Sequence, residues 1–316
     1  MSAEIALSVV VPLYDEVGCV ESLVTQVGRV LDGIGRPAEL IVVDDGSTDG
    51  SFAALRAARE REPRLRVVRL ARNFGQTAAL AAGLAAARGD VVATLDADLQ
   101  NDPADLPRLL NALGTDVDVV NGWRRDRQDP WLNRRLPSQI ANRLISAVTG
   151  TRLHDYGCTL RVMRGDLARS LPLYGEMHRF IPALAADEGA RVVELPVAHH
   201  PRTIGRSKYG IGRTVRVILD LITVRFLSGF GTRPIHLFGL LGLGSSGAGA
   251  MILTKLGFDR LILGQPIGGR PLTLLGLLLL IVGVQFVSIG LLGEMLVRTY
   301  HESQGKPIYR VRETLG

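Results

Sequence analysis

The sequence predicts an α/β domain built on a parallel sheet with crossover helices, followed by two helices that span a membrane. Between residues 7 and about 200, apolar runs of strand length alternate with helix-like segments, which is typical of such sheets. Polar residues follow the carboxyl ends of these runs. Further along, the stretches 234–254 and 271–293 contain no Asp, Glu, Lys or Arg, and roughly 20 apolar residues suffice to cross a bilayer.

The composition excludes several classes of protein. With 316 residues, 47% hydrophobic and 22% charged, the chain cannot belong to the disordered class. Its two cysteines, Cys19 and Cys158, lie far apart, so they exclude a disulfide framework or a Cys-rich zinc site and favour a reducing compartment. No secretory signal is expected, because residues 1–7 lack a basic residue and the apolar run at 9–13 is short.

Strands and helices alternate regularly over the first 95 residues. Apolar runs predict strands at 7–11, 40–43, 65–70 and 91–95. The intervening segments predict helices at 19–31, 51–61 and 77–87. In nucleotide-binding sheets of this kind, ligands bind beyond the carboxyl ends of the strands.

Acidic clusters follow three of these strands. They comprise Tyr14, Asp15 and Glu16 after the first strand, Asp44, Asp45, Ser47 and Asp49 after the second, and Asp96, Asp98, Gln100 and Asp102 after the fourth. Carboxylates gathered at one sheet edge would repel one another, so we expect a divalent cation, Mg²⁺ or Mn²⁺, with Asp98 and Gln100 among its oxygen ligands. The alternative for a single cluster is helix capping, by Asp45 or Ser47 for one helix and by Asp102 before Pro103 for another.

The distribution of positive charge predicts a membrane topology. Seven Lys and Arg residues flank the two spans on the outside and three lie between them: Arg216, Arg225, Arg233, Arg298, Lys306, Arg310 and Arg312, against Lys255, Arg260 and Arg270. This bias places both termini in the cytoplasm. We expect a cytosolic domain at 1–209, an interfacial amphipathic segment at 210–232, a transmembrane hairpin at 233–298 and a cytosolic tail at 299–316. The alternative for 210–232 is a solvated helix on the domain surface.

Small residues within the first span have two interpretations. Gly242, Gly244 and Gly247 fit a dinucleotide-binding spacing, but no strand precedes them, so we interpret them as helix-packing residues. The pairs Gly244/Ala248 and Ser245/Gly249 have the spacing that lets helices approach closely. They are candidates for contacts between copies of the chain in a homo-oligomer.

Several motifs together carry a resemblance to a known family. They are VVPLYDE at 10–16, VDDGSTDG at 43–50, RNFGQ at 72–76 and DADLQNDP at 96–103. In order and spacing they resemble the family 2 inverting glycosyltransferases of the GT-A fold, which have a Rossmann-like mixed sheet. Two further stretches, RTIGRSKYG at 202–210 and LGEMLVRTYHESQGKPIYRVRE at 292–313, resemble the polyisoprenyl-phosphate glycosyltransferases. That group includes the dolichol-phosphate mannose synthases and the bacterial undecaprenyl-phosphate glucosyltransferases.

The resemblance implies a reaction. A metal-dependent, inverting enzyme would move one sugar from a nucleotide-diphosphate sugar to a polyprenyl phosphate at the cytoplasmic face of the inner or plasma membrane. UDP-glucose is the favoured donor and GDP-mannose the alternative; a non-catalytic subunit that binds nucleotide sugar is the alternative from another class. No nucleic acid is expected as partner, because neither an aromatic platform nor a groove-reading motif accompanies the Arg-rich stretch 122–142.

The resemblance also implies roles for individual residues. The nucleotide sugar would be bound by Pro12, Tyr14, Glu16, Asp44, Ser47, Gln76, Asp96, Arg202, Ser207 and Lys208. The metal would be held by Asp98 and Gln100, and the catalytic residues would be Asp96, Asp98, Asp155 and Arg202. The acceptor phosphate would be bound by Arg124, Arg134 and Ser138, since guanidinium groups bind phosphate oxygens in forks.

Asp155 would orient a sugar hydroxyl or steady the acceptor site. A general base is not needed, because a phosphate monoester is already ionised near neutral pH and is itself the nucleophile. Catalysis would then rest on alignment and charge neutralisation. We expect structural roles rather than acid/base roles for His154, His199 and His200.

Overall fold

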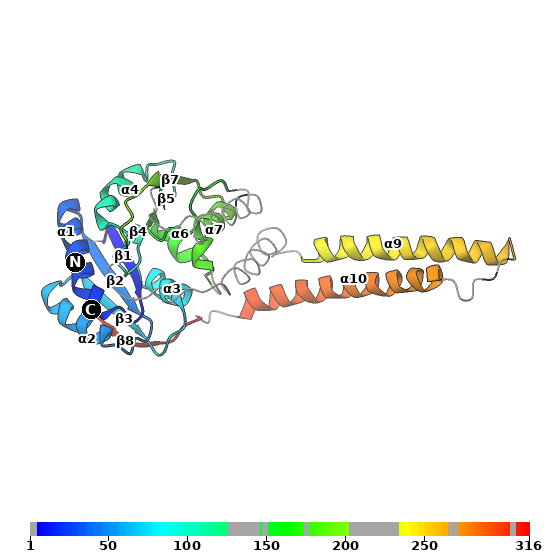
Figure 1. Ribbon diagram of the computed structural model, residues 1–316, viewed down its shortest axis with the longest axis horizontal. Coiled ribbons are helices and arrows are strands. Elements are labelled where there is room, and N and C mark those ends of the chain that lie inside the picture. The colour runs from blue at the N-terminus through cyan, green and yellow to red at the C-terminus, as the bar shows by residue number, and fades with distance from the viewer. Residues whose placement is uncertain are drawn as a thin grey trace. The chain divides into compact units, whose positions relative to one another are not determined.

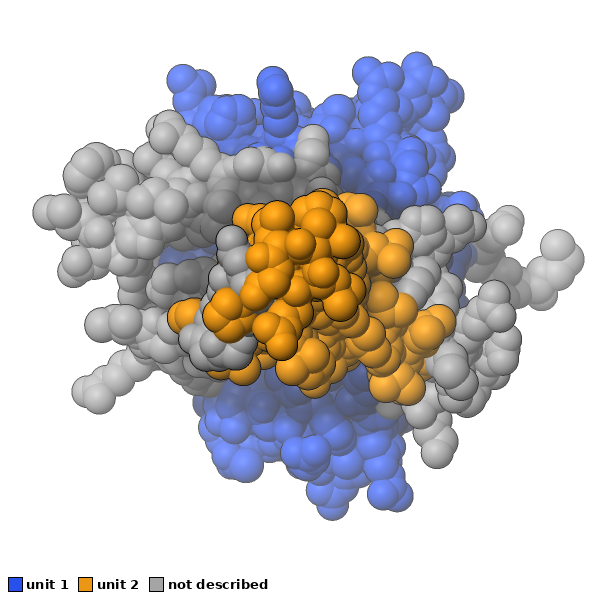
Figure 2. Space-filling view, turned by 90° about the vertical axis from the view of Figure 1, so that its right-hand side faces the viewer, with its two compact units in different colours: residues 1–224, 307–316 blue, residues 225–306 orange. Residues whose placement is uncertain are grey.

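The computed structural model describes residues 5–125, 146, 151–173, 177–201, 234–264, 266, 271–303 and 308–316 (Figure 1). The chain divides into two compact units, 1–224 with 307–316 and 225–306, which Figure 2 colours blue and orange. The predicted interfacial segment at 210–232 lies outside the described residues.

A mixed eight-stranded sheet forms the centre of the first unit, within the described residues (Figure 1). Its strands are β1 (Leu7–Leu13), β2 (Ala38–Asp44), β3 (Leu65–Leu70), β4 (Val91–Thr94), β5 (Val119–Trp123), β6 (Arg161–Arg164), β7 (Val192–Pro196) and β8 (Val311–Leu315). They lie in the order β7-β5-β6-β4-β1-β2-β3-β8. The four neighbours β4, β1, β2 and β3 are parallel, which confirms the predicted sheet, whereas β6 and β8 run antiparallel on either side of them.

Helices cover both faces of this sheet. They are α1 (Val20–Ile34), α2 (Ser51–Arg61), α3 (Gln76–Ala86), α4 (Leu106–Ala112), α6 (Gly165–Ser170) and α7 (Ile181–Asp187), with short 3₁₀ turns η1 (Val17–Cys19), η2 (Pro103–Asp105) and η4 (Met177–Arg179). α1 packs against α2 and α4, while α3 contacts β1, β2 and α6 (Figure 1). Because helices lie on both faces, the central strands are buried throughout: β2 has no residue even partly exposed.

The first helix shows how the sequence sets an element boundary. Its apolar residues Val20, Val24, Val27 and Leu31 recur at helical spacing and are buried. The helix continues to Ile34, beyond the predicted end at Leu31, and stops at Gly35, whose φ of 63° forms a left-handed cap. The predicted helix was therefore correct but one turn short.

The C-terminal segment folds back onto the first unit. The sequence predicts no strand in the tail, yet β8 pairs antiparallel with β3. The register shifts at this pairing: Arg69 lies opposite Glu313 and Leu70 opposite Val311. Arg312 is thus the extra residue of a β-bulge, a device that re-aims side chains at strand edges.

The second unit is a hairpin of two packed helices, α9 (Pro234–Leu261) and α10 (Pro271–Ser303). Glycines set the closeness of the packing. A Cβ on Gly242 would lie 2.6 Å from the Gly283 carbonyl oxygen, and one on Gly249 would lie 2.7 Å from that of Gly276. Gly242 is therefore a helix-packing residue, as predicted.

The other small residues of α9 behave differently. A Cβ on Gly244 or Gly247 would meet no atom within 4 Å, so neither takes part in the close approach to α10. Gly249, a candidate for contacts between copies of the chain, packs on α10 instead.

One helical stretch of the described residues, Pro271–Gly293 in α10, is long and apolar enough to cross a membrane, with a mean hydropathy of 2.5. The other predicted span, 234–254, forms the first part of α9, and its insertion into a membrane stays a prediction.

Candidate functional site

Hydrogen bonds join the segments that follow β1 and β2. Ser47 Oγ accepts from the Asp15 backbone N–H at 2.9 Å, and Asp15 Oδ1 accepts from the Thr48 N–H at 2.8 Å. The Glu16 N–H donates to Ser51 Oγ at 3.1 Å. The first two acidic clusters therefore meet at the carboxyl edge of the sheet, as the strand order predicts.

The two aspartates at the end of β2 bind different partners. Asp44 is fully buried; its Oδ1 accepts from the Ser47 N–H at 2.9 Å, and its Oδ2 lies 3.5 Å from Arg69 Nε. Asp45 accepts from the N–H groups of Phe74 and Gly75 at 2.8 and 2.9 Å. Burial, reinforced by the charge of Asp44, raises the pKa of Asp45 to about 6 despite these two hydrogen bonds.

These contacts show whether Asp45, Ser47 and Asp102 cap the helices that follow them. The N-cap of α2 is Gly50, without a side-chain cap, so capping by Asp45 or Ser47 is wrong. Both side chains make longer-range bonds that hold the loops together. Asp102, by contrast, accepts from the Ala104 N–H at 2.9 Å at the start of η2 and is the cap that was predicted.

A pocket of about 390 Å³ opens at the ends of these strands, a volume typical of small-molecule sites. Its walls are Tyr14 and residues 46–48 on one side, and residues 69–73 with Arg312 on the other. Gly46 makes the close approach of the two sides feasible: its φ is +70°, and a Cβ there would lie 2.5 Å from the Arg72 carbonyl carbon. Of the predicted nucleotide-sugar residues, Tyr14 and Ser47 line this pocket.

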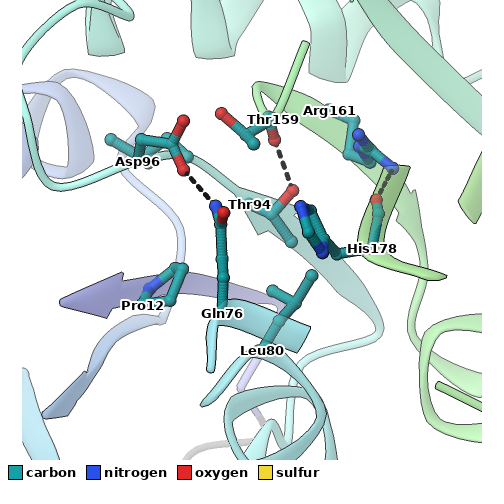
Figure 3. Close-up of a pocket in the computed structure, with 9 residues that line it drawn as sticks. Pro12, Gln76, Leu80, Thr94, Asp96, Thr159, Arg161 and His178 are labelled. Carbon is teal, nitrogen blue, oxygen red and sulfur yellow. Dashed lines mark hydrogen bonds between the residues drawn. The ribbon is translucent and has the colours of Figure 1, made fainter. Parts of the chain in front are cut away.

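Three other predicted residues, Pro12, Gln76 and Asp96, meet at a second cavity, shown in Figure 3. Gln76 Nε2 donates to Asp96 Oδ1 at 2.8 Å. The cavity offers about 10 Å³ to water, which is room for about one molecule. The cavity is too small for a sugar. The Asp96 carboxylate forms part of its wall.

The residues after β4 match the chemistry of a divalent cation. Burial, followed by the negative charge of Asp98, raises the pKa of Asp96 to about 6. A hydrogen bond to Thr159 and the charges of Arg124 and Arg161 oppose this rise but do not cancel it. Between Asp98 and Gln100, Leu99 adopts a φ of +60°, an uncommon conformation for a non-glycine residue and one found at functional sites.

Few protein ligands surround this carboxylate pair. Among the described residues, no group of three or more His, Cys, Asp and Glu side chains is placed to hold a metal. Two carboxylates and an amide oxygen still fit Mg²⁺ or Mn²⁺, because such ions commonly keep several positions for phosphate oxygens and water. Asp98 and Gln100 remain our proposed ligands.

The histidines named from the sequence are engaged in packing and hydrogen bonds. The His200 N–H donates to the Gln100 carbonyl oxygen at 2.9 Å, and its ring Nε2 lies 3.2 Å from Asp102 Oδ2. His199 pairs with Asn101 in an isolated bridge. This bridge places His199 and His200 next to the segment 100–102 that follows the carboxylate pair. Arg202, Ser207 and Lys208 lie outside the described residues.

Arg124 and Asp155 form a buried, two-pronged ion pair. Arg124 Nε lies 2.7 Å from Asp155 Oδ2, and Nη2 lies 2.9 Å from Oδ1. The Asp155 carboxylate also accepts from the backbone N–H groups of Arg124 and Gly157 at 3.3 and 3.1 Å. Burial disfavours the charge of Arg124, but the carboxylate outweighs it and raises the pKa of the guanidinium. Arg134 and Ser138, the other predicted acceptor residues, lie outside the described residues.

Sequence reasoning missed a buried arginine beside Asp96. Arg161 on β6 is 1% exposed and lines the cavity of Figure 3, where it donates to the carbonyl oxygens of His178 and Cys158. Burial lowers its pKa to about 10, while Asp96 and Asp155 act in the opposite direction. A charged residue between the buried Leu160 and Val162 was the only signal in the sequence.

Comparisons with known proteins match the whole chain. Residues 8–171 match glycosyl transferase family 2. The dodecaprenyl-phosphate galacturonate synthase of Rhizobium johnstonii is 47% identical over 97% of this chain and 92% of that protein. The undecaprenyl-phosphate 4-deoxy-4-formamido-L-arabinose transferase of Edwardsiella ictaluri is 37% identical over 98% and 94%.

Solved structures match about 71% of the chain. Glucosyl-3-phosphoglycerate synthase from Mycobacterium tuberculosis, solved with Mn²⁺, uridine diphosphate and glucosyl-3-phosphoglycerate, superposes with a TM-score of 0.54 at 25% identity. The match covers 71% of this chain and 80% of that one.

Proposed function

From the premise that the chain belongs to glycosyl transferase family 2, with the GT-A fold in its first unit, we propose that it moves one sugar from a nucleotide-diphosphate donor to a polyprenyl phosphate. One observation carries the proposal. A pocket of nucleotide size and the Asp96/Asp98 carboxylate pair lie at the same carboxyl edge of the sheet. Relatives named for polyprenyl-phosphate sugar synthesis match over nearly the whole length, including both helices, which supports the lipid acceptor.

In the proposed reaction the chain's residues bind and align the two substrates. Tyr14, Ser47 and Asp44 hold the nucleoside end of the donor, while Asp98 and Gln100 hold Mg²⁺ or Mn²⁺. When bound, the ion neutralises the diphosphate and so stabilises the departing nucleotide. Arg202, Ser207 and Lys208 close over the same diphosphate. These roles are proposals.

The acceptor needs no base. Its phosphate is already ionised near neutral pH, so it attacks the anomeric carbon from the face opposite the nucleotide and inverts the configuration. Arg124, with Arg134 and Ser138, holds this phosphate in our proposal, and Asp155 fixes the direction of the Arg124 guanidinium. Alignment and charge neutralisation supply the acceleration.

The sugar is the finer part of the proposal. Glucose was the sequence-based expectation, but the two relatives are named for galacturonate and for a formamido-arabinose. We therefore place a galacturonate donor ahead of glucose, and both ahead of mannose. Uridine diphosphate in the Mycobacterium tuberculosis enzyme supports a uridine nucleotide over guanosine.

The membrane arrangement is also a proposal. The apolar stretch Pro271–Gly293 and the lipid substrates named for the relatives support a membrane-anchored enzyme. We propose the two-helix hairpin at 233–298, an interfacial segment at 210–232 and cytoplasmic termini, so that the acceptor phosphate and the 1–209 domain share the cytoplasmic face of the membrane.

A donor-panel assay tests the function. Purified full chain with Mn²⁺ or Mg²⁺, polyprenyl phosphate and a panel of nucleotide sugars should release nucleoside diphosphate and yield a polyprenyl-phosphate sugar by mass spectrometry. Asp98→Ala should lower turnover by roughly 10²-fold or more. Asp90→Ala is the matched control, because Asp90 is exposed just before β4, at the opposite edge of the sheet, and should keep full turnover. Absence of nucleoside diphosphate release with every donor would overturn the proposal.

A further inference from the structure

A residue from the far end of the chain lines the 390 Å³ pocket. Arg312 on β8 shares its wall with residues 69–73 of the first unit. The β-bulge explains this position, because Arg312 has no register partner on β3. Its neighbour Glu313 forms an ion pair with Arg56 on α2 at 3.1 Å. That ion pair fastens β8 to α2 next to the bulge that carries Arg312.

The three arginines of the pocket differ in their engagement. Arg69 lies over the Phe52 ring at 4.2 Å and 3.5 Å from Asp44 Oδ2, and Arg72 lies over the Phe74 ring at 4.5 Å. Arg312 is exposed, and within the described residues it makes no ion pair or ring contact of this kind. Its guanidinium is therefore available to a ligand both for stacking and for hydrogen bonding, whereas the face of the Arg72 guanidinium is already stacked on Phe74.

The position of the pocket indicates which part of the donor it receives. The carboxylate pair follows β4, and the pocket extends to β3, three strands further along the order β4-β1-β2-β3. Neighbouring strands lie about 4.8 Å apart, so the two regions are separated by about 14 Å. That is close to the length of an extended nucleoside diphosphate. With the diphosphate at Asp98, the base falls in the pocket between Tyr14 and the arginines.

We propose that Arg312 binds the base of the nucleotide donor, so that the strand following both helices forms part of the donor site. A planar guanidinium stacks on a flat ring and also donates to the ring carbonyl oxygens. Tyr14 supplies an aromatic surface within the same pocket. The inference rests on the proposed function, and it assigns to β8 a specificity-determining residue for that reaction.

Direct binding of uridine diphosphate tests the inference. Titration calorimetry on the full chain in detergent with Mn²⁺ should give a dissociation constant about tenfold weaker for Arg312→Ala than for the unaltered chain. Arg312→Gln keeps a polar side chain of similar length and should weaken binding to a similar extent. Thermal unfolding of both variants checks that each keeps its fold. The matched control is Arg310→Ala: Arg310 is exposed just before the same strand and outside the pocket, and its bond to the Ala71 N–H is made by the backbone carbonyl, which the substitution keeps.

Steady-state kinetics give a second readout. The KM for the donor should rise in both Arg312 variants, while kcat and the KM for polyprenyl phosphate stay within twofold. Binding of uridine diphosphate within twofold of the unaltered chain in both variants, or equal weakening in Arg310→Ala, overturns the inference. If the unaltered chain binds neither uridine nor guanosine diphosphate, the proposed function itself fails, so the two failures are distinguishable.

Discussion

Removal of Arg124 tests how the centre of the site is held together. The Asp155 carboxylate is 3% exposed and accepts two hydrogen bonds from the guanidinium, at 2.7 and 2.9 Å, and two from backbone N–H groups. Breaking a buried ion pair by removing one partner costs about 3–5 kcal/mol, because the other charge stays buried. Since two backbone donors remain, we expect the low end, about 3 kcal/mol, for Arg124→Ala. In a domain of this size that lowers the Tm by about 10 °C.

Thermal unfolding of the purified full chain measures this loss. Asp155→Ala should cost a similar amount, and the double variant should cost about 1.5–3 kcal/mol less than the sum of the two, because the pair interacts directly. Arg125→Ala, at the next position, is the control: the Arg125 side chain is exposed and, among the described residues, its contact is with the Trp123 ring, 5.9 Å away. A Tm shift below about 2 °C for Arg124→Ala, or strict additivity in the double variant, would refute a structural role for the pair. Arg124 would then serve the acceptor alone, visible as a raised KM for polyprenyl phosphate.

Three further predictions follow from individual residues. The pKa of Asp45 is about 6 in the folded chain against 3.8 for the free side chain, so the folded state binds the proton more tightly and this residue's contribution to stability falls as pH rises from 4 to 6. The unfolding free energy of Asp45→Asn relative to the unaltered chain should therefore increase by about 2 kcal/mol over that range, and a constant difference would contradict this. Gly46→Ala should lower the unfolding free energy by about 2–5 kcal/mol in denaturant titrations, since it combines a φ of +70° with a contact of 2.5 Å to Arg72. Burial raises the pKa of the Cys158 thiol to about 12, so maleimide should label it only after unfolding; labelling of the native protein would show that the site opens.

The central strands were predictable because they are buried on both faces. β1 and β2 read as continuous apolar runs, and such runs have few alternatives. β8 has the sequence VRETL, with each residue exposed or half-buried, so no apolar run marks it. The pairing of β8 depends on the open edge of β3, which is distant in the sequence. The local sequence of residues 311–315 therefore cannot predict it.

The site, like the fold, was predictable where general rules of sheets apply and unpredictable where distant residues meet. That Tyr14 and Ser47 would meet, and that Gln76 and Asp96 would meet, follows from the rule that loops gather at the carboxyl ends of parallel strands. The capping role given to Asp45 failed because its partners lie 29 and 30 residues away. Similarly, Arg161 stands out as a charged residue between the apolar Leu160 and Val162, but the sequence does not indicate that its guanidinium is enclosed beside a distant carboxylate.

The return of β8 to the edge of β3 imposes an order on biosynthesis. Residues 311–315 follow both long helices in the sequence, so the ribosome translates the whole hairpin before β3 can acquire its last neighbour. Until then β3 presents unpaired N–H and C=O groups, which are prone to mispairing with other chains. In our proposal, the nucleotide pocket that Arg312 lines therefore stays incomplete until the hairpin has left the ribosome. Fragments that stop after β7 should be both weak nucleotide binders and prone to aggregation.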